Sequence, residues 1–176
     1  MRISGRSKHR RKSRGKTGEK VCTPSRKGEC KRGMEIRVYA PADEEAVIGL
    51  WKACDLVRSW NDPRKDIRRK LAVNPELFLV GVEEGKLVAT VMAGYEGHRG
   101  WINYLAVSPE RRRKGLGRAM MDEVERLLRQ LKCPKINLQV RAGNRAVMEF
   151  YQRLGYGMDE AVSMGKRLEH DGPAKA

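Results

Sequence analysis

Residues 101–117 read WINYLAVSPERRRKGLG, and this stretch decides the fold. Its apolar first half, 101–107, indicates a strand, and from Leu116 onward apolar side chains recur at helical spacing. A basic glycine loop joins the two. The amino terminus of a helix presents unpaired N–H groups and a partial positive charge, which together bind phosphate well. The stretch therefore predicts a strand, a phosphate-binding loop and a helix, in that order.

The glycines of this loop and the basic side chains around them both suit the binding of a pyrophosphate. Gly115 and Gly117 lack a Cβ, so we expect their backbone amides to approach phosphate oxygens closely. A P-loop would need Gly-Lys-Ser or Gly-Lys-Thr here, and a dinucleotide fingerprint would need Gly or Ala where Met120 stands. The loop therefore predicts neither nucleoside-triphosphate hydrolysis nor hydride transfer. The basic side chains around the glycines are Arg111, Arg112, Arg113, Lys114 and Arg118.

The residues before this stretch predict two helices and an antiparallel meander. Acidic residues at 43–45 are typical of a helix start, and Asp62-Pro63 reads as an N-cap followed by proline at the first helical position. Three successive strands with short connections imply antiparallel neighbours. The expected strands are 35–39, 77–82, 87–95 and 101–107.

The residues after the stretch predict a crossover. A long helix from Leu116 to Leu131 lies between two strands, 101–107 and 135–140, so these strands should be parallel neighbours. Asn144 can cap a fourth helix, and a terminal strand is expected at 159–168. The order β-α-α-β-β-β-α-β-α-β predicts an α/β fold with a mixed, mostly antiparallel sheet and helices on both faces.

Charge divides the 176-residue chain into parts. Thirteen of the 38 Lys and Arg residues and two of the 22 acidic residues fall in residues 1–33, so this segment carries +11 of the formal +16. With only Ile3 and Val21 as large aliphatic residues, we expect a disordered basic tail. We expect one domain at 34–170 and a flexible end at 171–176. The tail either binds nucleic acid or a ribosome, solubilises the protein, or lies upstream of a natural start at Met34.

Several classes of protein are not expected. No apolar run approaches the length of a membrane span and no secretory signal is evident, so we expect a cytoplasmic location. The four cysteines form no C-x-x-C pair and the three histidines have no metal-ligand spacing. We therefore expect free thiols and no metal.

The residues now point to a family. Arg112 to Gly117 match the [Gln/Arg]-x-x-Gly-x-[Gly/Ala] motif, and FYQRLGY at 150–156 follows Asn144 at the matching distance. From Met34 to about Leu168 the chain resembles the GNAT N-acetyltransferases, and CDL at 54–56 and WNDP at 60–63 resemble the YpeA branch. This resemblance implies a GNAT-type fold and direct transfer of an acetyl group from acetyl-CoA to a primary amine.

The resemblance also implies where acetyl-CoA binds. The main chain of Leu105, Ala106 and Val107 would pair with the pantetheine arm, and Asn144 would brace that arm farther along. N–H groups near Val107 would polarise the thioester carbonyl. The diphosphate would rest on the amides of Arg112, Arg113, Lys114, Gly115, Leu116, Gly117 and Arg118.

Catalytic roles follow less directly. The family position of Tyr151 implies the general acid for the departing thiolate, although a tyrosine beside Phe150 can also simply fill the core. The strand before the loop carries no carboxylate, so the base is unassigned. Glu96 and His98 are candidates acting through water, and bulk water is the alternative.

The acceptor side of the site is expected at Trp60, Asn61 and Tyr95, with Asp62 serving mainly as a helix cap. A protein N-terminus, a lysine and a small amine all remain open as acceptors. Two other hypotheses stay open as well. One is a non-catalytic module that binds acyl-CoA, and the other is an RNA- or ribosome-associated protein that uses its basic tail.

Overall fold

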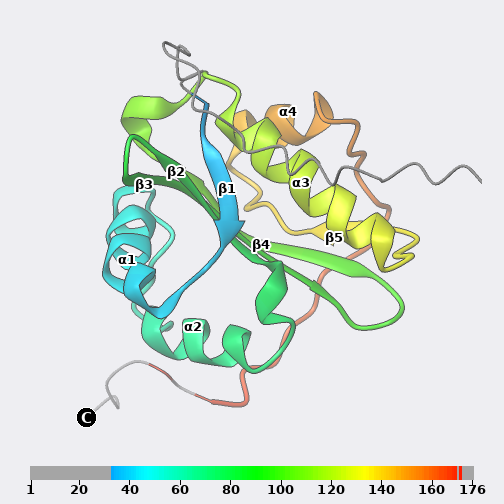
Figure 1. Ribbon diagram of the computed structural model, residues 1–176. Coiled ribbons are helices and arrows are strands. Elements are labelled where there is room, and N and C mark those ends of the chain that lie inside the picture. Colours follow the sequence, from blue (N-terminus) through cyan, green and yellow to red (C-terminus); the bar gives the residue numbers. More distant parts are fainter. Residues whose placement is uncertain (1–32, 170, 172–176) are drawn as a thin grey trace, which may run out of the picture. The chain divides into compact units, whose positions relative to one another are not determined.

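The computed structural model describes residues 33–169 and 171, which form a five-stranded sheet with two helices on each face (Figure 1). Three single 3₁₀ turns, Pro41–Asp43, Pro75–Leu77 and Pro109–Arg111, join some of these elements. In chain order the elements are β1 (Glu35–Val38), α1 (Glu44–Ala53), α2 (Pro63–Leu71), β2 (Phe78–Glu83), β3 (Lys86–Tyr95), β4 (Gly100–Val107), α3 (Leu116–Gln130), β5 (Ile136–Leu138) and α4 (Arg145–Gln152).

The sheet has the strand order β1-β2-β3-β4-β5. Strands β1 to β4 are antiparallel neighbours, whereas β4 and β5 run parallel. The predicted meander and the predicted crossover through α3 are therefore both confirmed. A helix between two strands returns the chain to the same end of the sheet, which is why β5 follows the direction of β4.

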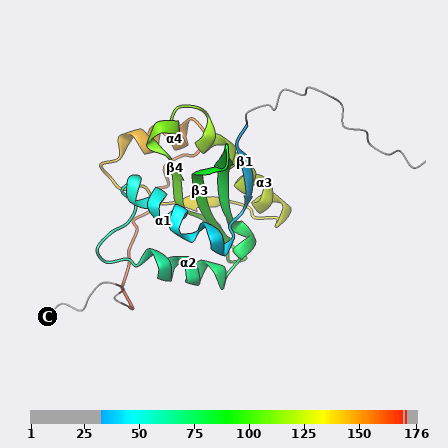
Figure 2. The ribbon, with the colours of Figure 1, turned by 60° about the vertical axis from the view of Figure 1, so that its left-hand side comes forward.

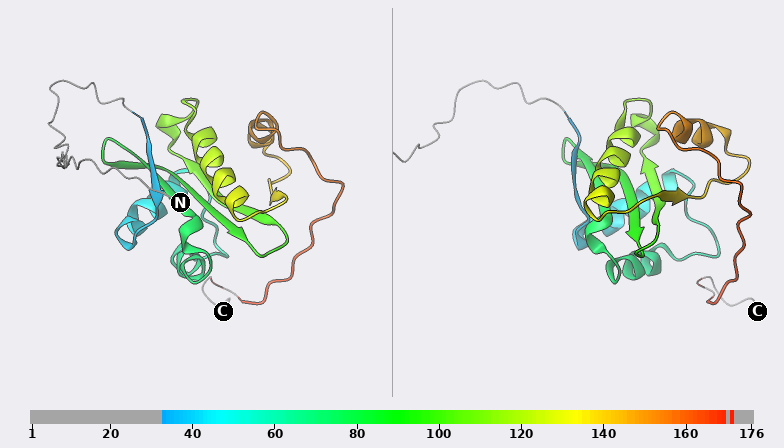
Figure 3. Two further views of the ribbon diagram at one scale, coloured as in Figure 1. Left: turned by 45° about the vertical axis from the view of Figure 1, so that its right-hand side comes forward. Right: turned by 90° about the vertical axis from the view of Figure 1, so that its right-hand side faces the viewer.

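The sheet divides the core into two layers. Along β3, Ala89, Val91 and Ala93 pack toward α3, while Thr90 and Met92 face α1, as the two-residue period of a strand requires. Figures 2 and 3 show α1 and α2 on one face and α3 and α4 on the other. Both faces of the middle strands are therefore buried.

Helix ends follow the predicted signals. The Asp62 carboxylate accepts the N–H of Arg64 at 2.8 Å and of Lys65 at 3.3 Å, so it caps α2. The Asn144 side chain accepts the N–H of Val147 at 3.3 Å and caps α4. Each cap satisfies N–H groups that have no partner within their helix.

The predicted strand at 159–168 is absent from the structure. These residues carry no strand, and Val162, Met164 and Leu168 are 87–92% exposed. A strand needs a backbone partner and a face to bury, and this segment has neither. It passes along the outside of the molecule toward α2 (Figure 3), held by side-chain contacts such as Lys135 to Asp159 at 2.6 Å.

Other expectations fall outside the described residues. The predicted tail, residues 1–33, lies outside them except for Gly33, and the predicted flexible end lies outside them except for Asp171. Within the described part of the chain, the structure has no helix that is long and apolar enough to cross a membrane.

Candidate active site

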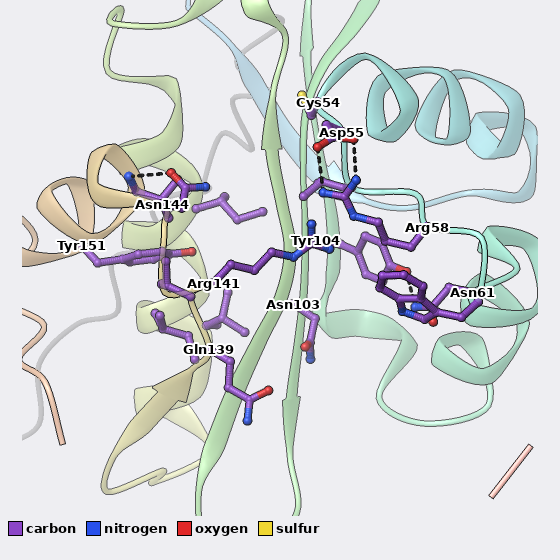
Figure 4. Close-up of a pocket in the computed structure, with 17 residues that line it drawn as sticks. Cys54, Asp55, Arg58, Asn61, Asn103, Tyr104, Gln139, Arg141, Asn144 and Tyr151 are labelled. Atoms are coloured by element: carbon purple, nitrogen blue, oxygen red, sulfur yellow. Dashed lines mark hydrogen bonds and ion pairs between the residues drawn. The ribbon is translucent and has the colours of Figure 1, made fainter. Parts of the chain in front are cut away.

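A cleft opens where β4 and β5 separate. Their pairing ends at Ile102 and Leu138, and beyond that point a cleft of about 480 Å³ lies between the strands. Figure 4 shows it with β4 on one side and α4 on the other. Its lining comes from the loop after α1, from β4, from the end of β5 and the segment after it, and from α4. The lining residues are Cys54, Asp55, Leu56, Arg58, Trp60, Asn61, Ile102, Asn103, Tyr104, Leu105, Leu138, Gln139, Val140, Arg141, Asn144, Val147 and Tyr151.

A β-bulge in β4 accompanies this separation. Met92 pairs with Asn103 and Thr90 pairs with Ala106, so two residues of β4 stand opposite the single residue between them on β3. One of the two, Tyr104, has a φ of +50°. Such a left-handed conformation is unfavourable for a bulky residue, and a bulge bends the strand that carries it. We attribute the separation of β4 from β5 to this bend.

Buried hydrogen bonds hold the bulge in place. The Trp51 indole N–H donates to the Thr90 hydroxyl at 2.9 Å, and that hydroxyl donates to the Tyr104 carbonyl at 3.1 Å. Trp51 and Thr90 are both fully buried. The Trp51 and Tyr104 rings also stack, with their centroids 4.1 Å apart. Packing and hydrogen bonds thus offset the strain at Tyr104.

The Tyr104 hydroxyl is fixed as well. It donates to an Asp66 oxygen at 2.6 Å, and the Asn61 amide nitrogen lies 3.4 Å from both the hydroxyl and that oxygen. Burial, and then the nearby Asp66 carboxylate, raise the pKa of Tyr104 to about 12. The hydroxyl is therefore protonated at neutral pH and donates to Asp66.

The glycine loop exposes amides at the start of α3. Arg113 and Gly115 have φ values of +63° and +82°, so the backbone turns sharply just before α3 begins at Leu116. Among the residues that the structure describes, no side chain caps α3, and its first turn holds no acidic residue. The first amides of this 15-residue helix therefore have neither an intrahelical partner nor a side-chain acceptor within the described part of the chain.

Gly117 has a packing role that differs from the sequence-based expectation. A Cβ there would lie 3.2 Å from the Phe150 ring, so the missing side chain lets α3 and α4 approach each other closely. A Cβ at Gly115 would meet nothing within 4 Å, and its positive φ explains the glycine.

The cations of the loop divide into two groups. Arg111 pairs with Glu83 at 3.2 Å, and Arg118 donates to the Arg153 carbonyl at 3.0 Å, so both have structural contacts. Arg112, Arg113 and Lys114 are exposed and form no ion pair with another described residue.

Tyr151 and Asn144 lie in the wall of the cleft, as does Leu105. Tyr151 is 8% exposed, and burial raises its pKa to about 12. Its hydroxyl end points into the cleft, toward β4 (Figure 4). Ala106 and Val107 continue β4 beyond the lining residues, and the Val107 carbonyl accepts the Cys54 thiol at 3.3 Å.

The three residues predicted for catalysis or the acceptor side that lie outside the cleft lining are Tyr95, Glu96 and His98. Glu96 accepts the N–H groups of His98 and Arg99 at 2.6 and 2.9 Å, and these bonds lower the pKa of Glu96. Tyr95 donates its hydroxyl to the Gly97 carbonyl at 3.0 Å. These residues shape the turn between β3 and β4, whereas Trp60 and Asn61 do line the cleft.

Sequence reasoning assigned no role to five residues at this site, Asp55, Arg58, Asp66, Tyr104 and Arg141. Tyr104 and Asp66 meet across 38 positions of sequence, and no local pattern indicates that contact. Arg58 pairs with Asp55, three positions earlier in the chain, at 2.7 Å. This ion pair can be recognised only once the conformation of the loop is known. Arg141 follows β5 by three positions and lines the cleft.

The comparisons with known proteins agree with this geometry. The model of the acetyltransferase (GNAT) family matches residues 44–156. The chain belongs to the GNAT family. An acetyltransferase of Pectobacterium atrosepticum is 48% identical over 138 residues, which cover 78% of this chain and 98% of the relative. An acetyltransferase of Sodalis glossinidius is 49% identical over 139 residues, with the same coverage. Membership of the YpeA branch stays a prediction.

Solved GNAT structures share the fold. Ard1 from Thermoplasma volcanium is 26% identical, with a TM-score of 0.63 over 72% of this chain and 84% of that one. Aminoglycoside N-acetyltransferase AAC(6')-Iy, solved with CoA, has a TM-score of 0.64 and is 19% identical, with 80% of this chain and 99% of that chain covered. The predicted family and fold are thus confirmed, and the chain is an acyltransferase. Among the described residues, no group of three or more His, Cys, Asp or Glu is placed to hold a metal.

Thr90→Val tests the bulge. The substitution keeps the shape of the side chain but removes the hydroxyl, which leaves the Trp51 N–H and the Tyr104 carbonyl without their partner. We expect the free energy of unfolding to fall by about 1–3 kcal/mol in urea titrations. In a Trp51→Phe background Thr90→Val should lower the free energy of unfolding by a smaller amount, because no indole N–H remains to lose its partner. Equal costs in the two backgrounds would contradict the hydrogen-bonded chain.

Proposed function

We propose that this protein is an N-acetyltransferase that transfers the acetyl group of acetyl-CoA directly to a primary amine. The observation that carries the proposal is the cleft between β4 and β5, with uncapped α3 amides beyond the end of β4 and the Tyr151 hydroxyl in its wall. Membership of the GNAT family supports it, as does a structural neighbour solved in complex with CoA.

The donor is proposed to lie along the open edge of β4. Beyond Ile102 this edge has no described strand partner, so the backbone of Leu105, Ala106 and Val107 is suited to bind an amide-containing arm as an added strand would. The diphosphate would rest on the α3 amides, with Arg112, Arg113 and Lys114 supplying charge. Asn144, already engaged as a helix cap, would contact the arm from the opposite wall.

The chemistry is one acyl transfer. The amine nitrogen forms a bond to the thioester carbonyl carbon, the carbon–sulfur bond breaks, and the thiolate leaves. N–H groups near Val107 would stabilise the negative charge that develops on the carbonyl oxygen. The Tyr151 hydroxyl would give its proton to the thiolate. Because its pKa is raised to about 12, Tyr151 keeps that proton throughout the neutral and mildly alkaline range.

Deprotonation of the amine is assigned to bulk water. Asp55 is the one carboxylate among the described residues that line the cleft, and it is paired with Arg58, while Glu96 accepts two backbone N–H groups on a turn outside the lining. The acceptor would therefore bind as the free base or lose its proton to solvent.

Neutralising Arg112, Arg113 and Lys114 to Gln tests donor binding. Calorimetry should show acetyl-CoA affinity falling at least tenfold, because the diphosphate loses its nearby cations. The kcat/KM for S-acetylpantetheine, which lacks the diphosphate, should be unchanged. Arg126→Gln, in an exposed ion pair elsewhere on α3, is the control and should alter neither value. Equal loss with both donors would contradict the placement of the diphosphate.

Tyr151→Phe tests the general acid. Turnover should fall tenfold or more while acetyl-CoA affinity stays within about twofold, because the ring and its packing remain. Tyr156→Phe is a matched control, since its hydroxyl binds Glu125 at 3.1 Å and does not line the cleft. Unaltered kcat in the Tyr151 variant would remove it from the mechanism.

Glu96→Gln and His98→Ala test the assignment of the base. In wild type, kcat/KM should rise with pH until the acceptor amine is fully deprotonated. Both variants should reproduce that profile, because neither side chain takes the proton. A profile whose acidic limb moves or disappears in one variant would identify that residue as the base.

A further inference from the structure

We propose that the acceptor carries a carboxylate close to its amine, and that Arg141 receives it. This inference rests on the proposed function and names the class of substrate for the same cleft. It is carried by the charges that line the cleft and by the direction in which the Arg141 side chain projects (Figure 4).

The cleft lining has one uncompensated positive charge. Of the lining residues only Asp55, Arg58 and Arg141 are charged at neutral pH. Arg58 donates to both Asp55 oxygens at 2.7 Å, so these two charges neutralise each other. The Arg141 carbonyl accepts the Asn144 N–H at 2.8 Å, but the Arg141 side chain forms no ion pair or hydrogen bond with another residue in the described part of the chain. Its charge therefore has no acidic partner at the cleft.

Asp66, the carboxylate that contacts Tyr104 from behind the lining, is already engaged. Asp66 accepts the Tyr104 hydroxyl at 2.6 Å and pairs with Arg69 at 3.2 Å. Arg69 in turn pairs with Glu169 and Asp171 on the outer side of α2. Asp66 thus holds Tyr104 in place and does not supply a counter-charge to Arg141.

Arg141 extends across the cleft toward Tyr104, from the segment between β5 and α4 (Figure 4). On the opposite wall Tyr104 presents a protonated hydroxyl that is fixed by Asp66. An acceptor in this space would meet a guanidinium on one side and neutral polar groups on the other. A guanidinium binds a carboxylate through two parallel hydrogen bonds, which gives both affinity and orientation.

The same charge disfavours other acceptors. A polyamine or an aminoglycoside would bring further positive charges beside Arg141, and unpaired like charges select against such ligands. The cations expected to bind the donor diphosphate, Arg112, Arg113 and Lys114, do not line this cleft. Arg141 is therefore separate from the donor's phosphate group and available to the acceptor.

The experiment compares acceptors that differ in one carboxylate. Initial rates are measured with saturating acetyl-CoA for alanine against alaninamide, for tetrapeptides that begin with Asp against Asn, and for Nα-acetyllysine against its amide. Spermidine is included as a cationic acceptor. Values of kcat/KM are expressed per free-base amine, because an amide lowers the pKa of a neighbouring amine. The full chain is used as wild type, as Arg141→Gln and as Arg145→Gln.

We expect the carboxylate member of at least one pair to be favoured at least tenfold over its amide and over spermidine. Arg141→Gln should bring that ratio close to one while calorimetry shows unchanged acetyl-CoA affinity. Arg145→Gln should keep the ratio, since Arg145 is an exposed neighbour that does not line the cleft.

Three results would overturn the inference. These are equal rates within every pair, preference for spermidine, and an Arg141→Gln variant that loses acetyl-CoA affinity but keeps its selectivity. Acetyl transfer to no amine at all, despite saturable acetyl-CoA binding, would instead contradict the proposed function, and the inference would fall with it.

Discussion

The structure depends on one strained residue in β4. Tyr104 adopts a left-handed backbone conformation because its carbonyl accepts a hydrogen bond from the Thr90 hydroxyl. Trp51 donates its indole N–H to that hydroxyl and stacks on the Tyr104 ring. The bulge bends β4 away from β5 and leaves a sheet edge facing a cleft. A regular β4 would continue its parallel pairing with β5, and no space for a ligand would remain between them. The hydrophobic layers on both faces of the sheet supply the stability that sustains this strain.

The site brings together parts of different origin. Strand β4 offers backbone groups along the cleft, α3 offers amides beyond the end of that strand, and α4 contributes the Tyr151 hydroxyl, which points into the cleft. The loop after α1 and the segment after β5 form the remaining walls. This division suits a two-substrate reaction, because the donor and the acceptor can each use a separate part of the surface. It would also allow Arg141, in the role proposed for it, to select acceptors without altering the proposed donor site.

Much of the fold could be predicted because its signals are local. Helix caps at Asp62 and Asn144, the meander and the crossover through α3 each follow from periodicity or from residues a few positions apart. The motif at 112–117 identified the family, which the comparisons confirm. The bulge at Tyr104 could not be predicted, because its cause is a contact with Thr90 and Trp51, which are distant in sequence. The strand expected at 159–168 to complete the order of elements does not form, because these residues have no backbone partner and no face to bury.

The central claim is that acetyl-CoA binds in the cleft between β4 and β5 with its diphosphate on the α3 amides. Backbone amide chemical shifts recorded during a CoA titration test it most directly. The account predicts saturable changes concentrated at 103–107 and 112–118, with little change along β1 and β2. No saturable change, or changes confined to another surface, would contradict it.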